Sequence, residues 1–250
     1  MHRFYIAPEH WNPDSLTLSG SEAHHARDVL RMKCGDKLVL FNGRGREFTA
    51  EIVDLDDRDI RLRKLHEAKI PPLRCRIVLG QAIPKGKNME LIVQKAVEIG
   101  AAEIAPIVSD RTVVQVDPES AAQKQAKWQQ IAMEAAKQCG QNWLARVDVP
   151  KSLGEFFDAV DVTRFDLRLI GSLQPDAQHL KKILADYSNE HRCLPESVLM
   201  LIGPEGDFTP AELALARRNG CRPITLGPII LRVETAAIYC LSVLSYELLM

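Results

Sequence analysis

The sequence predicts an α/β protein with a small β-rich domain at residues 1–70 and a larger domain at residues 74–250 that is built on a parallel sheet. Three observations support this. The first 65 residues contain short β-type runs separated by turns, strand and helix patterns alternate from residue 74 onward, and a Pro71-Pro72 pair lies in a linker-like stretch, 67–73. At 250 residues, the chain is long enough for one large domain or two smaller ones.

The first domain is expected to form a small barrel with one helix. The expected strands are residues 3–6, 37–41, 47–55 and 59–65. The expected turns are residues 42–45, which include two glycines, and the aspartate pair at 56–57. An amphipathic helix is expected over residues 21–32, closed by Gly35.

In the second domain, the alternation of strands and helices indicates a parallel sheet. The expected strands are residues 76–82, 103–108, 146–149, 166–170, 198–201 and 223–226. The expected helices are residues 87–99, 119–139, 152–159, 176–185, one that begins after Thr209, and a last one from residue 236. The helix after Thr209 has the strongest local signals, because Thr209 and Glu212 complete a capping box around Pro210, and Gly220 marks its end.

Two Gly-Pro loops, at residues 203–206 and 227–228, bracket that capped helix. Each follows an expected strand, and a third strand ends at Gly171-Ser172. A single Gly-Pro pair is most often an ordinary turn, but loops at the carboxyl ends of several parallel strands are where open α/β sheets bind ligands. Glycine allows close approach of the backbone to a ligand, so the sequence predicts a binding site here.

Charged residues follow the second of these loops. Glu234 suits a helix N-terminus, and Thr235 could cap the helix, so both have a purely structural alternative. Arg232 fits that alternative less well, because a cation is unfavourable at that end, and a role in stabilising negative charge is more attractive. Lys85-Gly86-Lys87 lacks the spacing of a phosphate-binding P-loop and is either a solvated basic turn or a phosphate contact.

Composition excludes several classes of protein. The net charge of −1 provides no global field for nucleic acid, so any contact with RNA needs a local basic patch. No apolar run reaches the ~20 residues of a membrane helix, and the N-terminal residues lack a signal-peptide core. Six scattered cysteines without a C-x-x-C pair indicate free thiols in a reducing cytoplasm and no metal site. The last helix is apolar nearly all round, which predicts burial either between subunits or within one core.

The residues described above resemble the RsmE family, bacterial 16S rRNA (uracil-N3)-methyltransferases of the SPOUT superfamily. The stretches that carry the resemblance in the second domain are Lys85-Gly86-Lys87-Asn88-Met89-Glu90, Gln94 to Gly100, Arg111, Glu134 to Cys139, Gly203-Pro204-Glu205-Gly206 and Leu226 to Ala236. In the first domain they are Arg3-Phe4-Tyr5, His24 to Arg31 and Gly43 to Phe48. One departure is Asp207, where the family usually has a second glycine.

The resemblance implies a PUA-like, RNA-binding barrel and a SPOUT domain whose C-terminal part is threaded into a trefoil knot. It also implies S-adenosylmethionine as cofactor, the 16S rRNA of the small ribosomal subunit as substrate, a homodimer with the last helix at its interface, no membrane association and a cytoplasmic location.

The resemblance also assigns site residues. Arg232 would stabilise the uracil anion, and Glu205 or Glu234 would act as base. The cofactor-binding residues would be Ile170, Gly171, Ser172, Ile202, Gly203, Pro204, Glu205, Gly206, Leu226, Gly227, Ile230, Leu231, Thr235 and Ala236. The RNA-binding residues would be Arg3, His25, Arg27, Arg31, Arg44, Arg46, Lys85, Lys87 and Arg111.

Three other functions compete with this hypothesis. A related SPOUT enzyme could methylate another RNA or another atom, such as a ribose 2′-hydroxyl. A non-catalytic RNA-binding factor for ribosome assembly could share the fold. A dinucleotide-dependent enzyme is disfavoured, because no strand is followed by a G-x-G-x-x-G motif.

Overall fold

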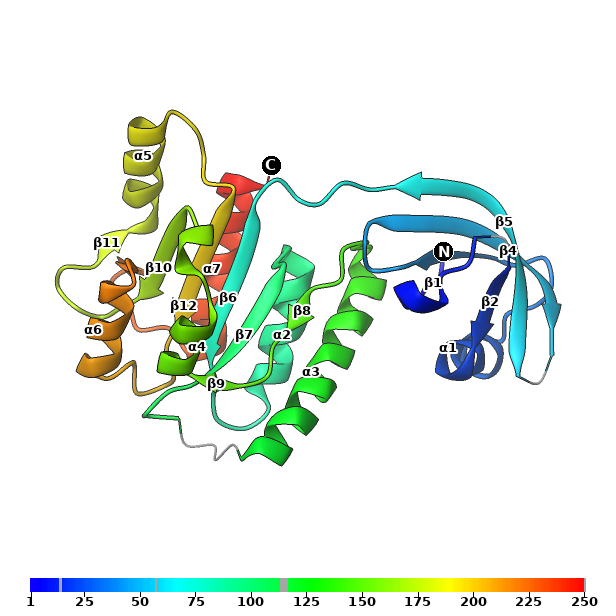
Figure 1. Cartoon of the computed structure of the whole chain (residues 1–250), viewed down its shortest axis with the longest axis horizontal. Coiled ribbons are helices and arrows are strands. Elements are labelled where there is room, and N and C mark those ends of the chain that lie inside the picture. The colour runs from blue at the N-terminus through cyan, green and yellow to red at the C-terminus, as the bar shows by residue number, and fades with distance from the viewer. Residues whose placement is uncertain (14, 57, 113–116, 250) are drawn as a thin grey trace. The chain divides into compact units, whose positions relative to one another are not determined.

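The computed structural model describes all residues except 14, 57, 113–116 and 250 (Figure 1). Asp57, in one of the expected turns, therefore lies outside the described residues. The chain divides into two compact units. Unit 1 comprises Met1–Pro72 together with Ala136–Leu144, and unit 2 comprises Leu73–Ala135 together with Ala145–Met250.

Unit 1 contains a five-stranded sheet with the order β1-β3-β4-β5-β2. Its strands are β1 (Arg3–Tyr5), β2 (Leu16–Ser19), β3 (Lys37–Phe41), β4 (Arg46–Leu55) and β5 (Asp59–Lys69). Neighbouring strands are antiparallel except β1, which pairs with β3 in parallel. Strand β2 was not among the expected strands. The expected linker at 67–73 is wrong in its first part, because pairing with β4 extends β5 to Lys69. Closure of the sheet into a barrel stays a prediction.

The helical part of unit 1 is split. The expected helix at 21–32 appears as α1 (Gly20–His24), followed by a π-helical turn at His25–Val29, and a short 3-10 helix at Pro8–His10 precedes both. Ala23 and Ala26 face the interior, where they join the buried cluster of the sheet. That cluster consists of Phe4, Ile6, Leu16, Leu18, Ala23, Ala26, Met32, Leu38, Leu40, Phe48, Ala50, Ile52, Ile60 and Leu62.

Unit 2 is built on an eight-stranded sheet in which every described pair of strands is parallel. Its strands are β6 (Arg76–Ala82), β7 (Glu103–Val108), β8 (Arg146–Val147), β9 (Lys151–Ser152), β10 (Leu167–Gly171), β11 (Gln178–His179), β12 (Ser197–Ile202) and β13 (Arg222–Thr225). The order is β11-β13-β10-β12-β6-β7-β8, with β9 beside β7. The expected parallel sheet is confirmed, and the strand expected at 146–149 is replaced by β8 and β9.

Six α-helices are described outside unit 1's sheet region: α2 (Asn88–Ile99), α3 (Pro118–Cys139), α4 (Leu153–Ala159), α5 (Leu180–His191), α6 (Pro210–Arg218) and α7 (Val233–Leu248). The end of α3 belongs to unit 1. The capping box of α6 is present as expected, with Pro210 in its first turn. The start expected for α5, residue 176, is wrong, because Gln178 and His179 pair with β13 and the helix begins only at Leu180.

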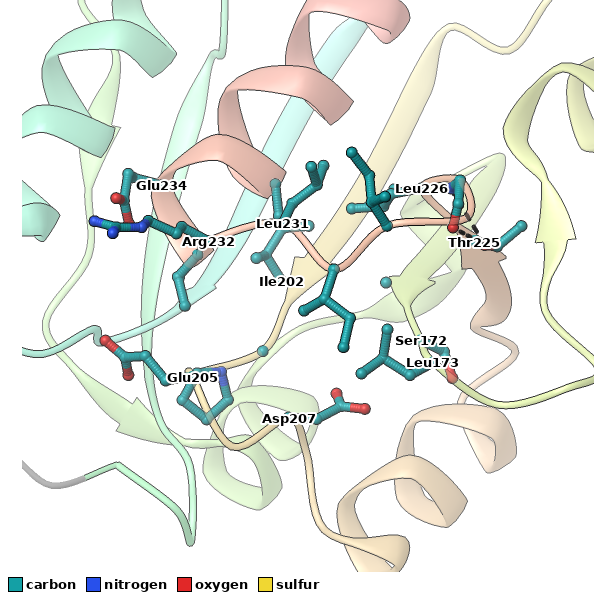
Figure 2. A pocket seen from close by; sticks show the side chains of 18 of the residues that line it. Ser172, Leu173, Ile202, Glu205, Asp207, Thr225, Leu226, Leu231, Arg232 and Glu234 are labelled. Atoms are coloured by element: carbon teal, nitrogen blue, oxygen red, sulfur yellow. Dashed lines mark hydrogen bonds between the residues drawn. The ribbon is translucent and has the colours of Figure 1, made fainter.

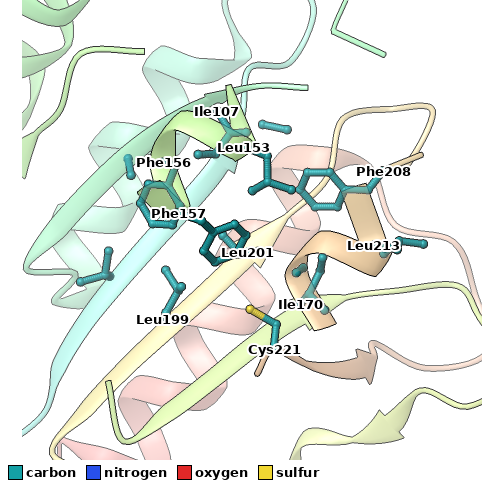
Figure 3. Close-up of a cluster of buried hydrophobic side chains, with 14 of the residues drawn as sticks. Ile107, Leu153, Phe156, Phe157, Ile170, Leu199, Leu201, Phe208, Leu213 and Cys221 are labelled. Carbon is teal, nitrogen blue, oxygen red and sulfur yellow. The ribbon is translucent and has the colours of Figure 1, made fainter. Parts of the chain in front are cut away.

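The sheet of unit 2 is covered on both faces. Figure 1 shows α2 and α7 on one face and α4 and α6 on the other. On the α4 side, the rings of Phe156 and Phe157 pack with Leu199 and Leu201 of β12 (Figure 3). All residues of β12 after Ser197 are buried, which accounts for the continuous apolar run of a strand between two layers. This packing holds the carboxyl ends of the strands in place.

The structure also describes the state of the cysteines, and it bears on membrane-spanning helices and metal sites. All six cysteines are free thiols. Burial raises the pKa of the Cys240 thiol in α7 to about 12, so that thiol serves as a packing group. Among the described residues, no helix combines the length and apolar character needed to cross a bilayer, and no three acidic, histidine or cysteine side chains converge on a metal-sized site.

Candidate functional site

Unit 2 has a cavity of about 470 Å³ at the carboxyl ends of three neighbouring strands, β13, β10 and β12 (Figure 2). The residues that line it are Asn88, Gly171, Ser172, Leu173, Ile202, Gly203, Pro204, Glu205, Asp207, Thr225, Leu226, Gly227, Ile229, Ile230, Leu231, Arg232, Val233, Glu234 and Ala236. Its volume falls within the ~300–1,000 Å³ of small-molecule sites. The position next to the reversal of strand order, between β12 and β6, is where open α/β sheets bind ligands.

The loop after β12 turns tightly behind Gly203. A Cβ atom at this position would lie 3.2 Å from Asp207 Oδ1 and 3.3 Å from the Phe208 nitrogen. The turn is closed by a hydrogen bond from the Asp207 N–H to the Pro204 carbonyl, 2.9 Å long. A side chain at Gly203 would therefore press on the turn that forms one wall of the cavity.

Asp207 has a left-handed backbone conformation, with φ of 59°. This conformation explains why a glycine is expected at the position, since glycine adopts it without the steric cost of a Cβ. Aspartate tolerates it better than most residues, and here Oδ1 accepts a hydrogen bond from the Phe208 N–H at 2.7 Å. The carboxylate thus stabilises the turn locally.

Asp207→Gly is expected to retain cofactor affinity within about threefold and Tm within about 3 °C, because relief of the left-handed strain offsets the lost hydrogen bond. Asp207→Val is expected to cost about 2 kcal/mol of unfolding free energy, since a β-branched residue strains this conformation. Thermal unfolding and calorimetric titration with S-adenosylmethionine measure both. A tenfold loss of affinity in Asp207→Gly would instead place the carboxylate against the ligand.

The loop after β13 carries the second glycine. Gly227 has φ of 116°, a conformation that other residues rarely adopt. Its N–H donates to Thr225 Oγ1 at 3.3 Å, which ties the start of the loop to the end of the strand. Ile229 and Ile230 follow at the rim of the cavity and are 70% and 81% exposed. The loop therefore presents apolar side chains toward a space that a ligand can fill.

One end of the cavity carries charged side chains, and the other combines leucine side chains with the hydroxyls of Ser172 and Thr225. In Figure 2, Arg232, Glu234 and Glu205 gather at one end, whereas Leu226 and Leu173 lie at the opposite end. Arg232 is the N-cap residue of α7, but its side chain makes no capping hydrogen bond. The guanidinium is exposed and has no ion pair with a described residue, so it is free to meet an anion.

The two glutamates at the charged end are held by the loop and helix that follow β6. Glu205 Oε1 accepts a hydrogen bond from the Lys85 N–H at 2.9 Å. Glu234 Oε2 accepts one from Asn88 Nδ2 at 3.2 Å. Each carboxylate keeps a second oxygen, so both can still act on a ligand proton. The start expected for the last helix, residue 236, is wrong, because α7 begins at Val233, and the alternative that Thr235 caps it is wrong too, since Thr235 lies within its first turn.

Most of the residues expected to bind the cofactor meet at this cavity. The lining includes the expected catalytic residues Arg232, Glu205 and Glu234, and the expected cofactor residues Gly171, Ser172, Ile202, Gly203, Pro204, Leu226, Gly227, Ile230, Leu231 and Ala236. It does not include Ile170, Gly206 or Thr235. Ile170 is buried within the core cluster of the sheet, and the Gly206 carbonyl accepts a hydrogen bond from Arg111.

Sequence reasoning missed six lining residues: Asn88, Leu173, Asp207, Thr225, Ile229 and Val233. Asn88 lies far along the chain in α2, and no local pattern connects it with Glu234. Leu173 and Thr225 adjoin expected residues, so a window one residue wider at each strand end would have included them.

The expected RNA-binding residues divide between the two units. In unit 1, Arg31, Arg44 and Arg46 have exposed side chains. His25 packs edge-on against Phe4, with ring centroids 6.1 Å apart. Arg27 bonds Asp28 and the Asp56 carbonyl, and its hydrogen bond is the main cause of the lowered pKa of Asp28.

Arg3 differs from these residues, because its guanidinium is engaged inside unit 1. It pairs with Glu47 at 2.8 Å, bonds Asn142 and lies over the ring of Phe41. Only 15% of its side chain is exposed, so its charge is already compensated within the unit. In unit 2, Lys85 and Lys87 are exposed, whereas Arg111 reaches the Gly206 carbonyl and so supports the loop after β12.

The chain matches two known domain families. Residues 71–245 match the family described as RNA methyltransferase domain, and residues 18–65 match the family described as RNA methyltransferase PUA domain. It is 31% identical to ribosomal RNA small subunit methyltransferase E of Synechocystis sp., over 94% of this chain and 74% of the relative. It is also 31% identical to the Bacillus subtilis protein of that name, over 93% and 90% of the two chains.

Two solved structures are similar to this chain over nearly its whole length. The structure of ribosomal RNA small subunit methyltransferase E from Neisseria gonorrhoeae bound to S-adenosyl methionine superposes with a TM-score of 0.85 at 29% identity, covering 99% of this chain and 98% of that one. A Legionella pneumophila protein solved with the bound cofactor SAM superposes with a TM-score of 0.86 at 34% identity, covering 98% and 97%.

Proposed function

We propose a function for this chain from one premise: it belongs to the RNA methyltransferase family of the ribosomal RNA small subunit methyltransferase E (RsmE) proteins. It methylates N3 of a uridine in 16S ribosomal RNA with S-adenosylmethionine as methyl donor. The observation that carries this proposal is the cavity formed by three adjacent strand-end loops, on a fold whose relatives are solved with this cofactor.

The residues of the cavity fit S-adenosylmethionine. Leu226 and Leu173 offer apolar contact for an adenine ring, and the loop backbone at Gly203 and Gly227 offers hydrogen-bonding groups that no Cβ covers. At the charged end the two carboxylates of Glu205 and Glu234 outnumber the guanidinium of Arg232, so the local charge suits a cationic sulfonium. The main-chain groups of Ile202, Leu226 and Leu231 would hold the adenine and the sulfonium.

When bound, the cofactor supplies an activated methyl group, so the chain's own residues must bind, orient and deprotonate the uracil. The N3–H of uracil is a weak acid whose anion spreads negative charge onto the flanking carbonyl oxygens. Arg232, free of any partner among the described residues, stabilises that charge. Glu205 or Glu234 takes the N3 proton. Because N3 lies on the pairing edge, the target base must be unpaired or flipped out.

Several finer features belong to the same proposal. Residues 1–70 form a PUA-like, RNA-binding barrel, and residues 74–250 form a SPOUT methyltransferase domain with a trefoil knot in its C-terminal part. Support comes from the PUA family match and from the position of β10 between β13 and β12 in the sheet. The active form is a cytoplasmic homodimer with α7 at its interface, which the exposed side chains of Tyr239 and Tyr246 favour. In unit 2, the exposed residues Lys85 and Lys87 contact the RNA beside the cavity.

The experiment that tests this function uses small ribosomal subunits from cells lacking the enzyme. Subunits and, separately, naked 16S rRNA are incubated with the protein and labelled S-adenosylmethionine, and the modified nucleoside is identified by mass spectrometry. The expected product is 3-methyluridine. A methyl group on a ribose or on another base would indicate a related enzyme with a different target. Binding of the subunit without any transfer would indicate an assembly factor.

A further inference from the structure

We propose that a basic and aromatic surface on unit 1 binds single-stranded RNA by stacking an unpaired base on Trp143. This surface, called here the Trp143 surface, consists of Arg44, Arg46, Lys69 and Trp143. The proposal rests on the proposed function, because it names where the RNA substrate contacts the enzyme. None of the sequence patterns singled out Trp143, which follows the end of α3 but belongs to unit 1.

The indole of Trp143 is held in a fixed position. Its Nε1 donates a hydrogen bond to the Ile70 carbonyl at 2.9 Å, and its backbone forms an antiparallel bridge with Arg44. A Cβ atom on Gly45 would lie 2.8 Å from the indole, so the absence of a side chain there lets the ring lie against the β3–β4 turn. The residue is nevertheless 41% exposed. An immobilised, exposed ring is a good platform for stacking.

Three cations adjoin the residues that hold the indole in place: Arg44 and Arg46 flank Gly45, and Lys69 precedes Ile70. Arg46 on β4 and Lys69 on β5 are directly opposite each other in the antiparallel pair, and both are exposed. Like charges in that position repel each other. Neither they nor Arg44 forms an ion pair with a described residue. Glu47, which follows Arg46 on β4, is already bound by Arg3 and by Asn142. An anion between these cations would relieve the repulsion.

This combination matches the chemistry of single-stranded RNA. Phosphates neutralise the cations, and an aromatic ring stacks on a base of any sequence. Three other exposed cations of β5, Arg61, Arg63 and Lys64, differ from these because each is paired with a carboxylate. The Trp143 surface therefore contributes affinity for an unpaired region of the substrate and little sequence specificity.

The test compares full-length wild-type protein with Trp143→Ala, Trp143→Phe, Arg46→Gln and a matched control, Arg58→Gln. Arg58 is an exposed arginine at the opposite end of the β4–β5 pair. Binding of single-stranded 16S rRNA fragments is measured at several salt concentrations, along with methylation kinetics and affinity for S-adenosylmethionine. Tryptophan emission reports stacking directly, because Trp128 is buried and Trp11 is stacked on Phe48.

Trp143→Ala is expected to weaken RNA binding and raise KM about tenfold to a hundredfold, with kcat and cofactor affinity unchanged. RNA should quench the emission of the wild type but not of Trp143→Phe, which should bind RNA within a few-fold of wild type. Arg46→Gln should reduce the slope of log affinity against log salt by about one, and Arg58→Gln should not.

Undiminished quenching in Trp143→Phe, or equal effects of Arg46→Gln and Arg58→Gln, would overturn the proposal even if Trp143→Ala failed to fold. These outcomes are separate from the proposed function. If the wild type methylates RNA and the Trp143 and Arg46 variants bind RNA as the wild type does, only the Trp143 surface is rejected. RNA binding that depends on Trp143, without any methyl transfer, would reject only the enzymatic function.

Discussion

Arg232→Ala is expected to lower the rate of methyl transfer about 10²- to 10³-fold while leaving the affinity for S-adenosylmethionine within about threefold. The guanidinium lies at the charged end of the cavity, exposed and without an ion-pair partner among the described residues. Its side chain makes no capping hydrogen bond to α7, so truncation to alanine should not shorten the helix. A group that stabilises charge only as uracil ionises affects kcat and kcat/KM equally.

Arg232→Lys and Arg218→Ala are the controls for this prediction. Lysine retains the charge but not the planar fork, so transfer is expected to recover in part. Arg218 is an exposed arginine of α6 that does not line the cavity, so its loss should change neither rate nor affinity. Calorimetry measures cofactor binding and labelled cofactor measures transfer. Loss of cofactor binding in folded Arg232→Ala would assign Arg232 to the cofactor instead of to the uracil.

Gly203→Leu is expected to weaken the binding of S-adenosylmethionine by about a hundredfold or more and to abolish methylation. A Cβ atom here would be 3.2 Å from Asp207 Oδ1 and from the Phe208 ring, closer than such contacts normally are. The larger side chain must either enter the cavity or displace the turn at 204–208. Either movement removes a wall of the site.

Gly154→Leu provides the matched control, because nothing lies within 4 Å of a Cβ at Gly154 in α4. That variant should bind the cofactor as the wild type does, since leucine favours the helix. Thermal unfolding of both variants without ligand distinguishes a damaged site from a damaged fold. A folded Gly203→Leu protein with wild-type affinity would show that the cofactor binds elsewhere.

Local signals predicted the parts of the fold that are stabilised locally. The capping box of Thr209 and Glu212 placed the start of α6, because its two hydrogen bonds lie within four residues. The apolar run in β12 predicted a strand covered on both faces. The two Gly-Pro loops predicted where the cavity lies, since parallel strands bring their carboxyl ends to one edge.

The features that sequence reasoning missed depend on distant partners. The start of α5 was wrong because pairing with β13, a strand far along the chain, holds Gln178 and His179 extended. Asn88 was missed because only the fold brings it to Glu234. The contacts of Arg3 with Glu47 and Asn142 were equally invisible, so its charge suggested a free surface residue. Hydrophobic periodicity indicates which face of a single helix or strand is buried, and it does not indicate which distant residues pair with it.

The assignment of Ala136–Leu144 to unit 1 has a practical consequence for dissecting the protein. Cleavage at the diproline would release a fragment that lacks Lys137 and Asn142, the partners of Glu22 and Glu47. Glu22, whose side chain is only 15% exposed, would then lose its partner Lys137, and Glu47 would keep Arg3 alone. An N-terminal fragment that folds alone would need residues 136–144 fused to it. The boundary between the two units therefore does not correspond to a single position in the sequence.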